Sequence, residues 1–373
     1  MPSNPFEHLQ RILTIRLDNI GDVVMLSPAL RALRQAYPQA EIALMASNAG
    51  TQVAPLLTWI DEVITWRAIW QEIGKDLPTE PEKERELFRL LEAKKFDAAF
   101  IFTSFSQSPF PPAYACYMAG IPLRVGQSRE FGGGLLSHWI RPLPDEVHQV
   151  ERNLNLLWGT GVPAEDRNLE LHIPPADQQR VSAILVQVGI GPAQSFIALA
   201  PGASAAARRY DEKRFAEAAR MLVSQTGIPV VVIGSPREMG TFPTLESLAG
   251  SSPLVHSLIG KTSVVEMAEI IRRSALVIAN NSGSMHIADA FQRPMVILFS
   301  GTETLQQWMP RSPNARILNR PTECTPCRGF QCPYQMECLD VPAEEIVTTA
   351  LSLFKASFPN SPLARPLVSS TRR

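Results

Sequence analysis

The sequence predicts an α/β fold with two doubly wound domains, each built on a parallel sheet. Its 373 residues are enough for about two domains of ordinary size. Each half of the chain alternates short runs of apolar and β-branched residues with longer patterns of helical period. This alternation is typical of parallel strands joined by helices. Hydrophobic residues make up 45% of the chain, so both domains can bury a core.

The apolar runs give the expected strands, and the helical patterns between them give the expected helices. The strands are expected at 11–16, 41–46, 62–65 and 98–102 in the first half, and at 196–200, 230–233, 276–279 and 296–299 in the second. The helices are expected at 23–37, 83–93, 151–158, 212–225, 264–273 and 285–291. Pro28 lies inside the first of these helices and should kink or divide it, because proline has no amide hydrogen to donate.

A polar segment with three prolines, residues 162–175, is the expected linker between the domains. We therefore expect an N-terminal domain at 1–165 and a C-terminal domain at 176–355. The last residues, 356–373, are rich in Pro, Ser and Arg and are expected to be disordered. Residues 77–86 are charged and contain proline, which predicts a surface insertion. Two doubly wound domains carry their ligand loops at the carboxyl ends of the strands, which predicts a shared central cleft.

Composition and charge argue against a nucleic-acid-binding protein, a secreted protein and a membrane-spanning protein. The net charge of -1 shows no basic excess, which argues against a nucleic-acid partner. The N-terminus lacks the pattern of a secretory signal, and no run of about 18 apolar residues is present. Four of the five cysteines lie close together near the C-terminus, unlike the pattern of a disulfide-rich secreted domain. These features predict a cytoplasmic protein.

The loop after the first expected strand carries Gly21 and Asp22. Gly21 permits a positive φ or a close backbone approach. Asp22 stands at the start of a helix, where an aspartate commonly caps the helix. It is equally placed to act as a general base on an acceptor hydroxyl at the mouth of the cleft. The loop matches neither the dinucleotide fingerprint G-x-G-x-x-G nor the phosphate loop G-x-x-x-x-G-K-[ST], which disfavours a nicotinamide dehydrogenase or an ATPase.

The loop after the strand at 196–200 consists of small residues followed by Arg208 and Arg209. Small residues let backbone amides approach a ligand, and guanidinium groups suit phosphate oxygens. The loop is therefore a candidate diphosphate site. The alternative is a flexible loop with two solvated arginines.

Two further loops of the second half carry candidate ligand-binding residues. After the strand at 276–279, Ser282 or Ser284 can cap the next helix, Gly283 leaves room for a ligand, and His286 can face an anion or serve the structure. After the strand at 230–233, Glu238 can accept hydrogen bonds from ribose hydroxyls or remain an ordinary surface carboxylate.

A cluster of cysteines has the spacing C-x2-C-x4-C-x5-C and consists of Cys324, Cys327, Cys332 and Cys338. Four thiols at this spacing suit a structural zinc ion or an iron–sulfur cluster. A pair of disulfides and a set of packed free thiols are the alternatives, and the spacing does not choose among them. We expect the cluster to brace the segment before the last helix, on a loop separate from the contacts to a ligand.

Together these segments resemble glycosyltransferase family 9, the lipopolysaccharide heptosyltransferases. The matching stretches are ILTIRLDNIGDVVMLSPALRALRQAYP, IPLRVG and HQVERNLNLL in the first half, and ALAPGASAAARRYDEKRFAEAA, LIGKTSVVEMAEII and NNSGSMHIADAFQRPMVILFSGTE in the second. The resemblance implies two Rossmann-like domains around a central cleft, the GT-B architecture. It also implies an acceptor held by the first domain, a nucleotide sugar held by the second, and inversion at the anomeric carbon without a catalytic metal. The donor would be a nucleotide diphosphate sugar such as ADP-heptose, and the acceptor a lipid-linked glycan reached by peripheral contact with the inner membrane.

The resemblance also assigns roles to residues of this sequence. Asp22 matches the catalytic base. Arg208 stands where the family has a lysine that contacts the donor phosphates, and Arg209 matches the arginine that follows it. The donor-binding loop is matched by Ser282, Gly283 and His286.

Asn281 and Tyr210 depart from the family pattern, which has aspartate and tryptophan at these positions. Because asparagine carries no charge, Asn281 keeps open the alternative of a catalytically inactive binding protein of glycan assembly. A nucleotide-sugar epimerase, which can share the two-domain architecture, is the other alternative, although the Gly21-Asp22 turn gives it no support.

Overall fold

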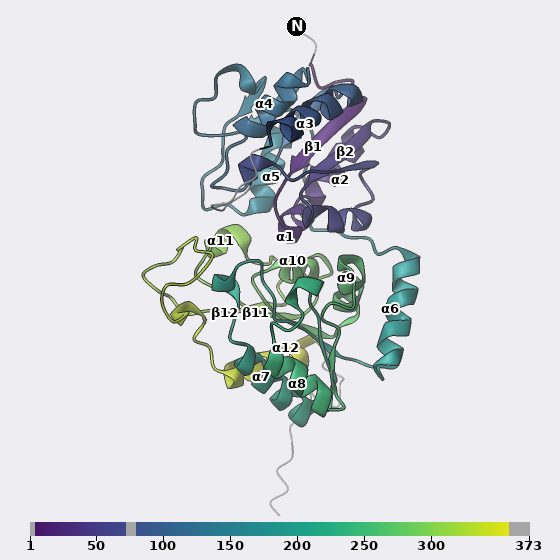
Figure 1. Cartoon of the computed structure of the whole chain (residues 1–373), viewed down its shortest axis with the longest axis vertical. Coiled ribbons are helices and arrows are strands. Elements are labelled where there is room, and N and C mark those ends of the chain that lie inside the picture. The colour runs from purple at the N-terminus through teal and green to yellow at the C-terminus, as the bar shows by residue number, and fades with distance from the viewer. Residues whose placement is uncertain (1–3, 72–79, 358–373) are drawn as a thin grey trace, which may run out of the picture. The chain divides into compact units, whose positions relative to one another are not determined.

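The computed structural model describes residues 4–71 and 80–357. The chain folds into two compact units, which are described separately below (Figure 1). Unit 1 comprises Met1–His172 with Gln306–Trp308, and unit 2 comprises Ile173–Leu305 and Met309–Arg373. The division after His172 falls within the segment 162–175. Each unit contains one parallel sheet with helices, which confirms the predicted fold class.

The sheet of unit 1 has six strands in the order β3-β2-β1-β4-β5-β6, and all neighbouring pairs are parallel. The strands are β1 (Arg11–Arg16), β2 (Glu41–Ala46), β3 (Glu62–Thr65), β4 (Ala98–Ile101), β5 (Leu123–Gln127) and β6 (His138–Ile140). The chain starts at the centre, moves outward, returns to the centre beside β1 and then moves outward on the other side. This is the doubly wound order, with its switch point between β1 and β4.

The sheet of unit 2 repeats this order with its own strands, β12-β11-β10-β7-β8-β9. All of its neighbouring pairs are parallel too. The strands are β7 (Ile197–Ala200), β8 (Val230–Val232), β9 (Val255–Ser257), β10 (Leu276–Asn280), β11 (Met295–Leu298) and β12 (Ala315–Leu318). The switch point of unit 2 therefore lies between β7 and β10.

Each expected helix is present within a few residues. Those of unit 1 are α1 (Ile20–Val24), α2 (Ser27–Ala36), α3 (Pro81–Lys94), α4 (Phe110–Met118) and α5 (Gln149–Trp158). Those of unit 2 are α6 (Pro175–Gln187), α7 (Glu212–Thr226), α8 (Pro243–Ser251), α9 (Val264–Arg273), α10 (Gly283–Ala290) and α12 (Ala343–Ser357), and α11 (Leu305–Trp308) lies at the boundary of the two units. Of these, α4, α6, α8 and α12 are additional helices that the sequence analysis did not place. Short 3₁₀ helices are η1 (Gly50–Leu56), η2 (Ile69–Gln71), η3 (Gly133–Leu135), η4 (Ala206–Arg208), η5 (Pro236–Glu238) and η6 (Glu337–Leu339).

The expected helix at 23–37 is divided as Pro28 predicts. It becomes α1 and α2, and Pro28 stands in the first turn of α2, where its missing amide hydrogen costs nothing. Residues 356 and 357 of the expected tail belong to α12, which ends at Ser357. Residues 358–373 lie outside the described residues, as do residues 77–79 of the expected insertion, and Pro81 already begins α3.

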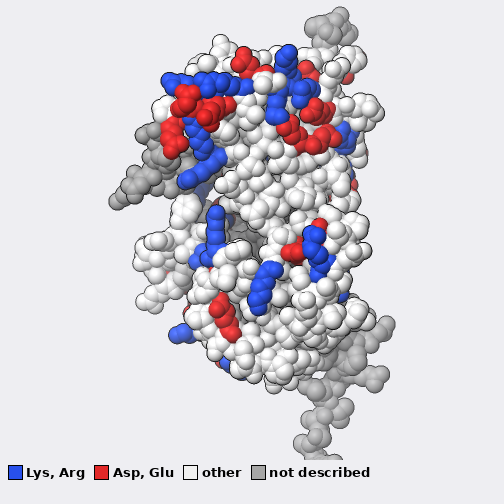
Figure 2. All heavy atoms as spheres, turned by 45° about the vertical axis from the view of Figure 1, so that its right-hand side comes forward, with Lys and Arg blue, Asp and Glu red and all other residues white. Residues whose placement is uncertain are grey.

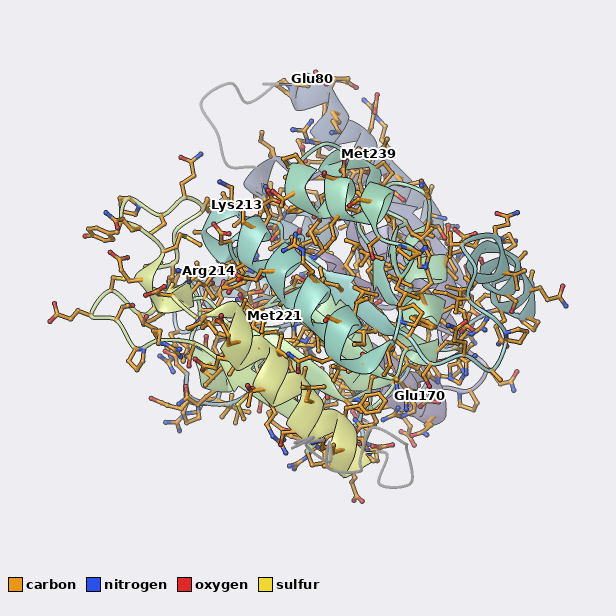
Figure 3. The ribbon with its side chains drawn as sticks, turned by 90° about the horizontal axis from the view of Figure 1, so that it is seen from below. Glu80, Glu170, Lys213, Arg214, Met221 and Met239 are labelled. Atoms are coloured by element: carbon orange, nitrogen blue, oxygen red, sulfur yellow. The ribbon has the colours of Figure 1, made fainter. Side chains whose placement is uncertain are left out.

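Each sheet buries side chains on both faces. In unit 1, Leu13 and Ile15 of β1 pack with residues of α3 and α4 in one cluster. In unit 2, β7 and β10 pack with α7, α8 and α12, which lie side by side in Figure 3. Met221 of α7, labelled there, lies against this cluster. Strands covered on both faces are apolar throughout, and this is why the central strands are easily located in the sequence.

None of the described helices is long and apolar enough to cross a lipid bilayer. Figure 2 shows basic and acidic side chains close together on one face of the protein, which agrees with the net charge of -1.

Candidate functional site

The candidate residues of unit 1 follow β1 and β4, the two strands at the switch point. The first turn after β1 forms α1, whose N-cap is Asn19. Asp22 occupies the third position of the helix, and its Oδ2 accepts a hydrogen bond from the backbone amide of Asn19 at 3.1 Å. Asp22 thus contributes to the cap without being the N-cap residue. Gly21 lies buried within α1, in right-handed helical conformation rather than with positive φ.

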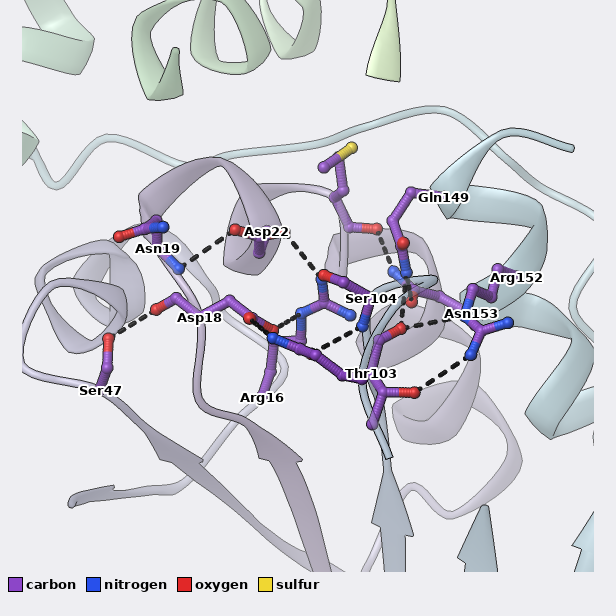
Figure 4. Close-up of polar contacts among 12 residues, drawn as sticks. Arg16, Asp18, Asn19, Asp22, Ser47, Thr103, Ser104, Gln149, Arg152 and Asn153 are labelled. Atoms are coloured by element: carbon purple, nitrogen blue, oxygen red, sulfur yellow. Dashed lines mark hydrogen bonds and ion pairs between the residues drawn. The ribbon is translucent and has the colours of Figure 1, made fainter. Parts of the chain in front are cut away.

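Arg16, the last residue of β1, is fully buried between two carboxylates (Figure 4). Its Nη2 donates to Oδ1 of Asp22 at 2.8 Å, and its Nε lies 2.8 Å from Oδ2 of Asp18. The same Nη2 also donates to Oγ of Ser104, in the loop after β4, at 2.8 Å. Both oxygens of Asp22 therefore have a donor from the protein, which fixes the orientation of this carboxylate.

Asp18 is a second carboxylate of this site, which the sequence analysis did not identify. Burial raises the pKa of Asp18 to about 6, although the positive charge of Arg16 opposes the rise; the negative charge of Asp22 adds to it. A hydrogen bond from Gln107 lowers this pKa again. A carboxylate directly after a buried strand, at the switch point of the sheet, is the signal that could have revealed Asp18.

The start of α5 holds the loops after β1 and β4 in place. Gln149 and Arg152 donate to the backbone carbonyl of Thr103, each at 3.1 Å. Asn153 donates to the carbonyl of Met25, just after α1, at 3.0 Å. These buried side chains belong to the stretch HQVERNLNLL and come from a helix far along the chain (Figure 4). They fix the position of the turn that carries Asp22.

In unit 2, two consecutive asparagines at the end of β10 position the loops on either side. Asn280 donates to the carbonyl of Pro201 at 2.6 Å and accepts from the amide of Tyr210 at 3.1 Å. It thereby fixes both ends of residues 201–210, which we call the arginine loop. Asn281 accepts from the amide of Ser300 at 3.1 Å, and so positions residues 299–304, the loop after β11.

The two arginines of the arginine loop have different partners. Arg208 donates through Nε to Oγ1 of Thr302 at 3.2 Å and forms an ion pair with Glu303, both in the loop after β11. Arg209 donates through Nε to the carbonyl of Ala203 at 3.0 Å, within its own loop. The alternative of two merely solvated arginines therefore does not describe the structure. Only Arg208 points its charge toward a neighbouring loop.

The remaining candidates lie on loops of the same sheet edge. Glu238 uses Oε2 to accept from the amide and hydroxyl of Ser235. Its Oε1 faces Gly202, because a Cβ atom added to that glycine would lie 1.7 Å from this oxygen. Glycine at position 202 is thus required for the carboxylate to lie against the arginine loop.

The loop between β10 and α10 places Ser282 at the N-cap and Gly283 in the first position of the helix. Ser284 lies inside α10 and is not the cap. The Ser282 side chain makes no capping hydrogen bond, and its hydroxyl is buried. His286 is buried in α10. Because β11, β10, β7 and β8 are neighbours, the loops carrying these candidates and the two arginines share one edge of the sheet.

Comparison with known proteins identifies the family. Residues 84–337 match the model of glycosyltransferase family 9, described as heptosyltransferase. The chain belongs to glycosyltransferase family 9. This assignment makes it a glycosyltransferase and argues against the alternative of a nucleotide-sugar epimerase.

Family 9 relatives match nearly the whole chain. The chain is 29% identical to lipopolysaccharide heptosyltransferase 2 of Escherichia coli K12 over 317 residues, which is 83% of this chain and 87% of that protein. A solved structure of E. coli ADP-heptose lipopolysaccharide heptosyltransferase II superposes with a TM-score of 0.72 at 23% identity, covering 93% of this chain and 99% of that one. A structure of E. coli heptosyltransferase with ADP-2-deoxy-2-fluoro heptose gives a TM-score of 0.64 at 17% identity over 91% and 98% of the two chains. At these identities the two structures show the shared fold.

The four cysteines of this family 9 chain are free thiols in the structure. Cys324, Cys327 and Cys332 line one cavity of about 420 Å³. Burial raises the pKa of Cys338, and the other three cysteines raise it further. Among the described residues, no group of three or more His, Cys, Asp or Glu side chains is arranged to hold a metal ion.

The cysteine segment, residues 324–338, is not separate from the other loops, contrary to our expectation. The amides of Cys327 and Arg328 donate to the carbonyls of Gly301 and Thr302 at 2.9 and 3.0 Å. The carbonyl of Phe330 accepts from the amide of Ala207 at 3.0 Å. The cysteine segment therefore connects the arginine loop to the loop after β11.

Proposed function

We propose that this family 9 enzyme transfers a heptose from a nucleotide diphosphate sugar to a lipopolysaccharide-type acceptor, with inversion at the anomeric carbon. The names of its relatives, a lipopolysaccharide heptosyltransferase and an ADP-heptose enzyme, support the substrate class. The single observation that carries the proposal is the pair of partly buried carboxylates around the fully buried Arg16 at the switch point of unit 1, where a doubly wound sheet presents its functional loops.

In this proposal Asp22 is the general base. It removes the proton from the acceptor hydroxyl as the oxygen of that hydroxyl attacks the anomeric carbon. Each oxygen of Asp22 accepts one hydrogen bond from the protein and keeps a further lone pair for the acceptor. The fixed orientation of the carboxylate supports this role, because a base must lie within hydrogen-bond reach of the proton it removes.

Asp18 shares the guanidinium group of Arg16 with Asp22. Because Arg16 contacts both carboxylates, Asp18 helps to hold the guanidinium group in the position from which it orients Asp22. Asp18 is in this view a positioning residue that acts through Arg16.

Unit 2 binds the donor. Arg208 stabilises the diphosphate as negative charge grows on it during departure, and a guanidinium group is well suited to two phosphate oxygens. Oε1 of Glu238 lies beside the arginine loop and is placed to accept from a ribose hydroxyl. The backbone at Gly283 and the buried hydroxyl of Ser282 offer further contacts at the start of α10. Arg209 and Asn281 hold these loops through their hydrogen bonds, and together with His286 they stay predicted donor-binding residues.

The reaction needs no metal in this proposal. A zinc ion or iron–sulfur cluster bound by the four cysteines stays a prediction with a structural role. Thiols grouped around one cavity suit such a group chemically, and their present arrangement is not that of a formed site.

We also propose that the enzyme works in the cytoplasm and meets a lipid-linked acceptor by peripheral contact with the inner membrane. The apolar stretch 105–117 supports this in part. Within α4, Pro112, Ala113 and Cys116 are buried as core residues, while Tyr114 and Tyr117 are exposed. Cell fractionation tests the placement, and a strictly periplasmic protein would contradict it.

A transfer assay tests the proposed function. ADP-heptose is supplied with and without a heptose-deficient lipopolysaccharide core, and the released nucleoside diphosphate is measured. Release that depends on the acceptor is expected. Conversion of the donor without acceptor would indicate an epimerase, and donor binding without any turnover would indicate an inactive binding protein.

A further inference from the structure

The guanidinium group of Arg208, which the proposed function assigns to the donor diphosphate, forms an ion pair with the carboxylate of Glu303. Both side chains are partly buried, with 27% and 23% of their surfaces exposed. Their loops are held on opposite sides of β10 by Asn280 and Asn281. The pairing is therefore built into the loops, and it is not an incidental contact of two long, mobile side chains.

A diphosphate and the Glu303 carboxylate compete for the same N–H donors of Arg208. Both are anions, and a carboxylate that remained beside a bound diphosphate would repel it. Thr302 does not compete in this way, because its hydroxyl is neutral and contacts the Nε of the guanidinium group.

The competition acts more strongly on the product than on the donor. In a nucleotide sugar each phosphate is esterified on both sides and carries about one negative charge. After transfer, the terminal phosphate of the nucleoside diphosphate is a monoester with a charge of roughly -1.5 to -2 at neutral pH. A fixed carboxylate at Arg208 therefore disfavours the product more than the substrate.

We propose that Glu303 is an internal counterion of Arg208 that weakens binding of the nucleoside diphosphate product and so promotes its release. This proposal rests on the proposed function and adds to it a residue that sets the balance between donor and product affinity. Glu303 is a positioning residue here, because it acts through Arg208.

The test is isothermal calorimetry with ADP and with ADP-heptose on the full chain. Glu303→Gln keeps the shape of the side chain and removes its charge. It is expected to tighten ADP binding roughly 1.5- to 5-fold, the range of an exposed ion pair, and to tighten ADP-heptose binding less. Glu303→Asp keeps the charge and should stay near the wild type. Glu344→Gln, an exposed glutamate in the first turn of α12, removes the same charge elsewhere in unit 2 and should change neither affinity.

A double-mutant cycle shows whether the effect passes through Arg208. In an Arg208→Ala background, the effect of Glu303→Gln on ADP affinity should shrink toward none. Unchanged or weaker ADP binding by a folded Glu303→Gln variant would overturn the inference while leaving the proposed function intact. If the wild type binds no ADP, or Arg208→Ala binds it as tightly as the wild type, the proposed donor site itself is wrong.

Discussion

Arg16 is the residue on which the proposed acceptor site depends. It is a fully buried cation at the end of a central strand, and it contacts the carboxylates of Asp18 and Asp22. A buried charge is costly unless it is paired, so Arg16 needs at least one ionised partner. Variants at these three side chains should therefore be checked for folding as well as for turnover.

Replacement of the proposed base tests its role directly. Asp22→Asn should lower turnover about 10²- to 10⁴-fold, because the acceptor hydroxyl loses its proton acceptor. Donor affinity, measured by calorimetry, should stay near the wild-type value, because Asp22 and the arginine loop belong to different units. Full turnover by this variant would rule out the role.

Asp18→Asn should lower turnover, because the neutral amide no longer forms the ion pair that helps to hold the guanidinium group of Arg16 beside Asp22. Ser104→Ala removes a neutral partner of Arg16 and serves as the control. Wild-type turnover in a folded Asp18→Asn variant would contradict the positioning role.

Stability provides a second readout for Asp18. The ordinary pKa of an aspartate is 3.8, and the pKa of Asp18 is about 6 in the folded protein, so the folded state holds this proton more tightly than the unfolded chain. The ionised carboxyl therefore destabilises the fold, and this loss develops as pH rises from about 4 to 6. The stability of Asp18→Asn relative to the wild type should increase over that range in thermal unfolding. A constant difference between the two proteins would contradict the raised pKa.

At the scale of secondary-structure elements, the cysteine segment braces the arginine loop and the loop after β11, which the proposed function assigns to the donor. Its backbone joins the arginine loop to the loop after β11 through Ala207, Gly301 and Thr302. A change in the order of this segment should consequently reach Arg208. This differs from our expectation from sequence, which treated the cluster as independent of donor contacts.

Cys327→Ser should therefore lower thermal stability and also weaken binding of a nucleoside diphosphate. If the segment binds a metal, chelation should have the same two effects, because thiolate ligands fix the loop only while the ion is bound. Elemental analysis of anaerobically purified protein, paired with thiol counting, measures the occupancy. Cys116→Ser replaces a buried cysteine of unit 1 and should leave nucleotide affinity unchanged. Unaltered affinity in a destabilised Cys327→Ser variant would contradict the brace.

Strands with a continuous apolar run and helices with a regular apolar face could be predicted from the sequence. β1, β2 and β3 lie where expected, and α9 matches to the residue. β6 and β12 are short and only partly buried, so they lack the apolar run that marks a central strand. Asn280 and Glu303 depend on partners distant in sequence, and no local pattern reveals such pairs.

At the scale of the whole molecule, the same order of strands carries a different set of polar side chains in each unit. Each unit starts at the centre of its sheet and places polar side chains after the two strands of its switch point. Unit 1 places two carboxylates and an arginine there, whereas unit 2 places asparagines that hold an arginine loop. The first set suits proton removal from a hydroxyl, and the second suits a diphosphate.

The proposed function implies a direct displacement. In this proposal the acceptor oxygen, deprotonated by Asp22, attacks the anomeric carbon from the side opposite the departing diphosphate, so no sugar becomes attached to the protein. The measurement that tests this most directly is the anomeric configuration of the transferred sugar, determined by NMR on the product formed from a donor of known configuration. Inversion is the expected result. Retention of configuration would contradict the proposed mechanism, because retention requires a second displacement or a different geometry of attack.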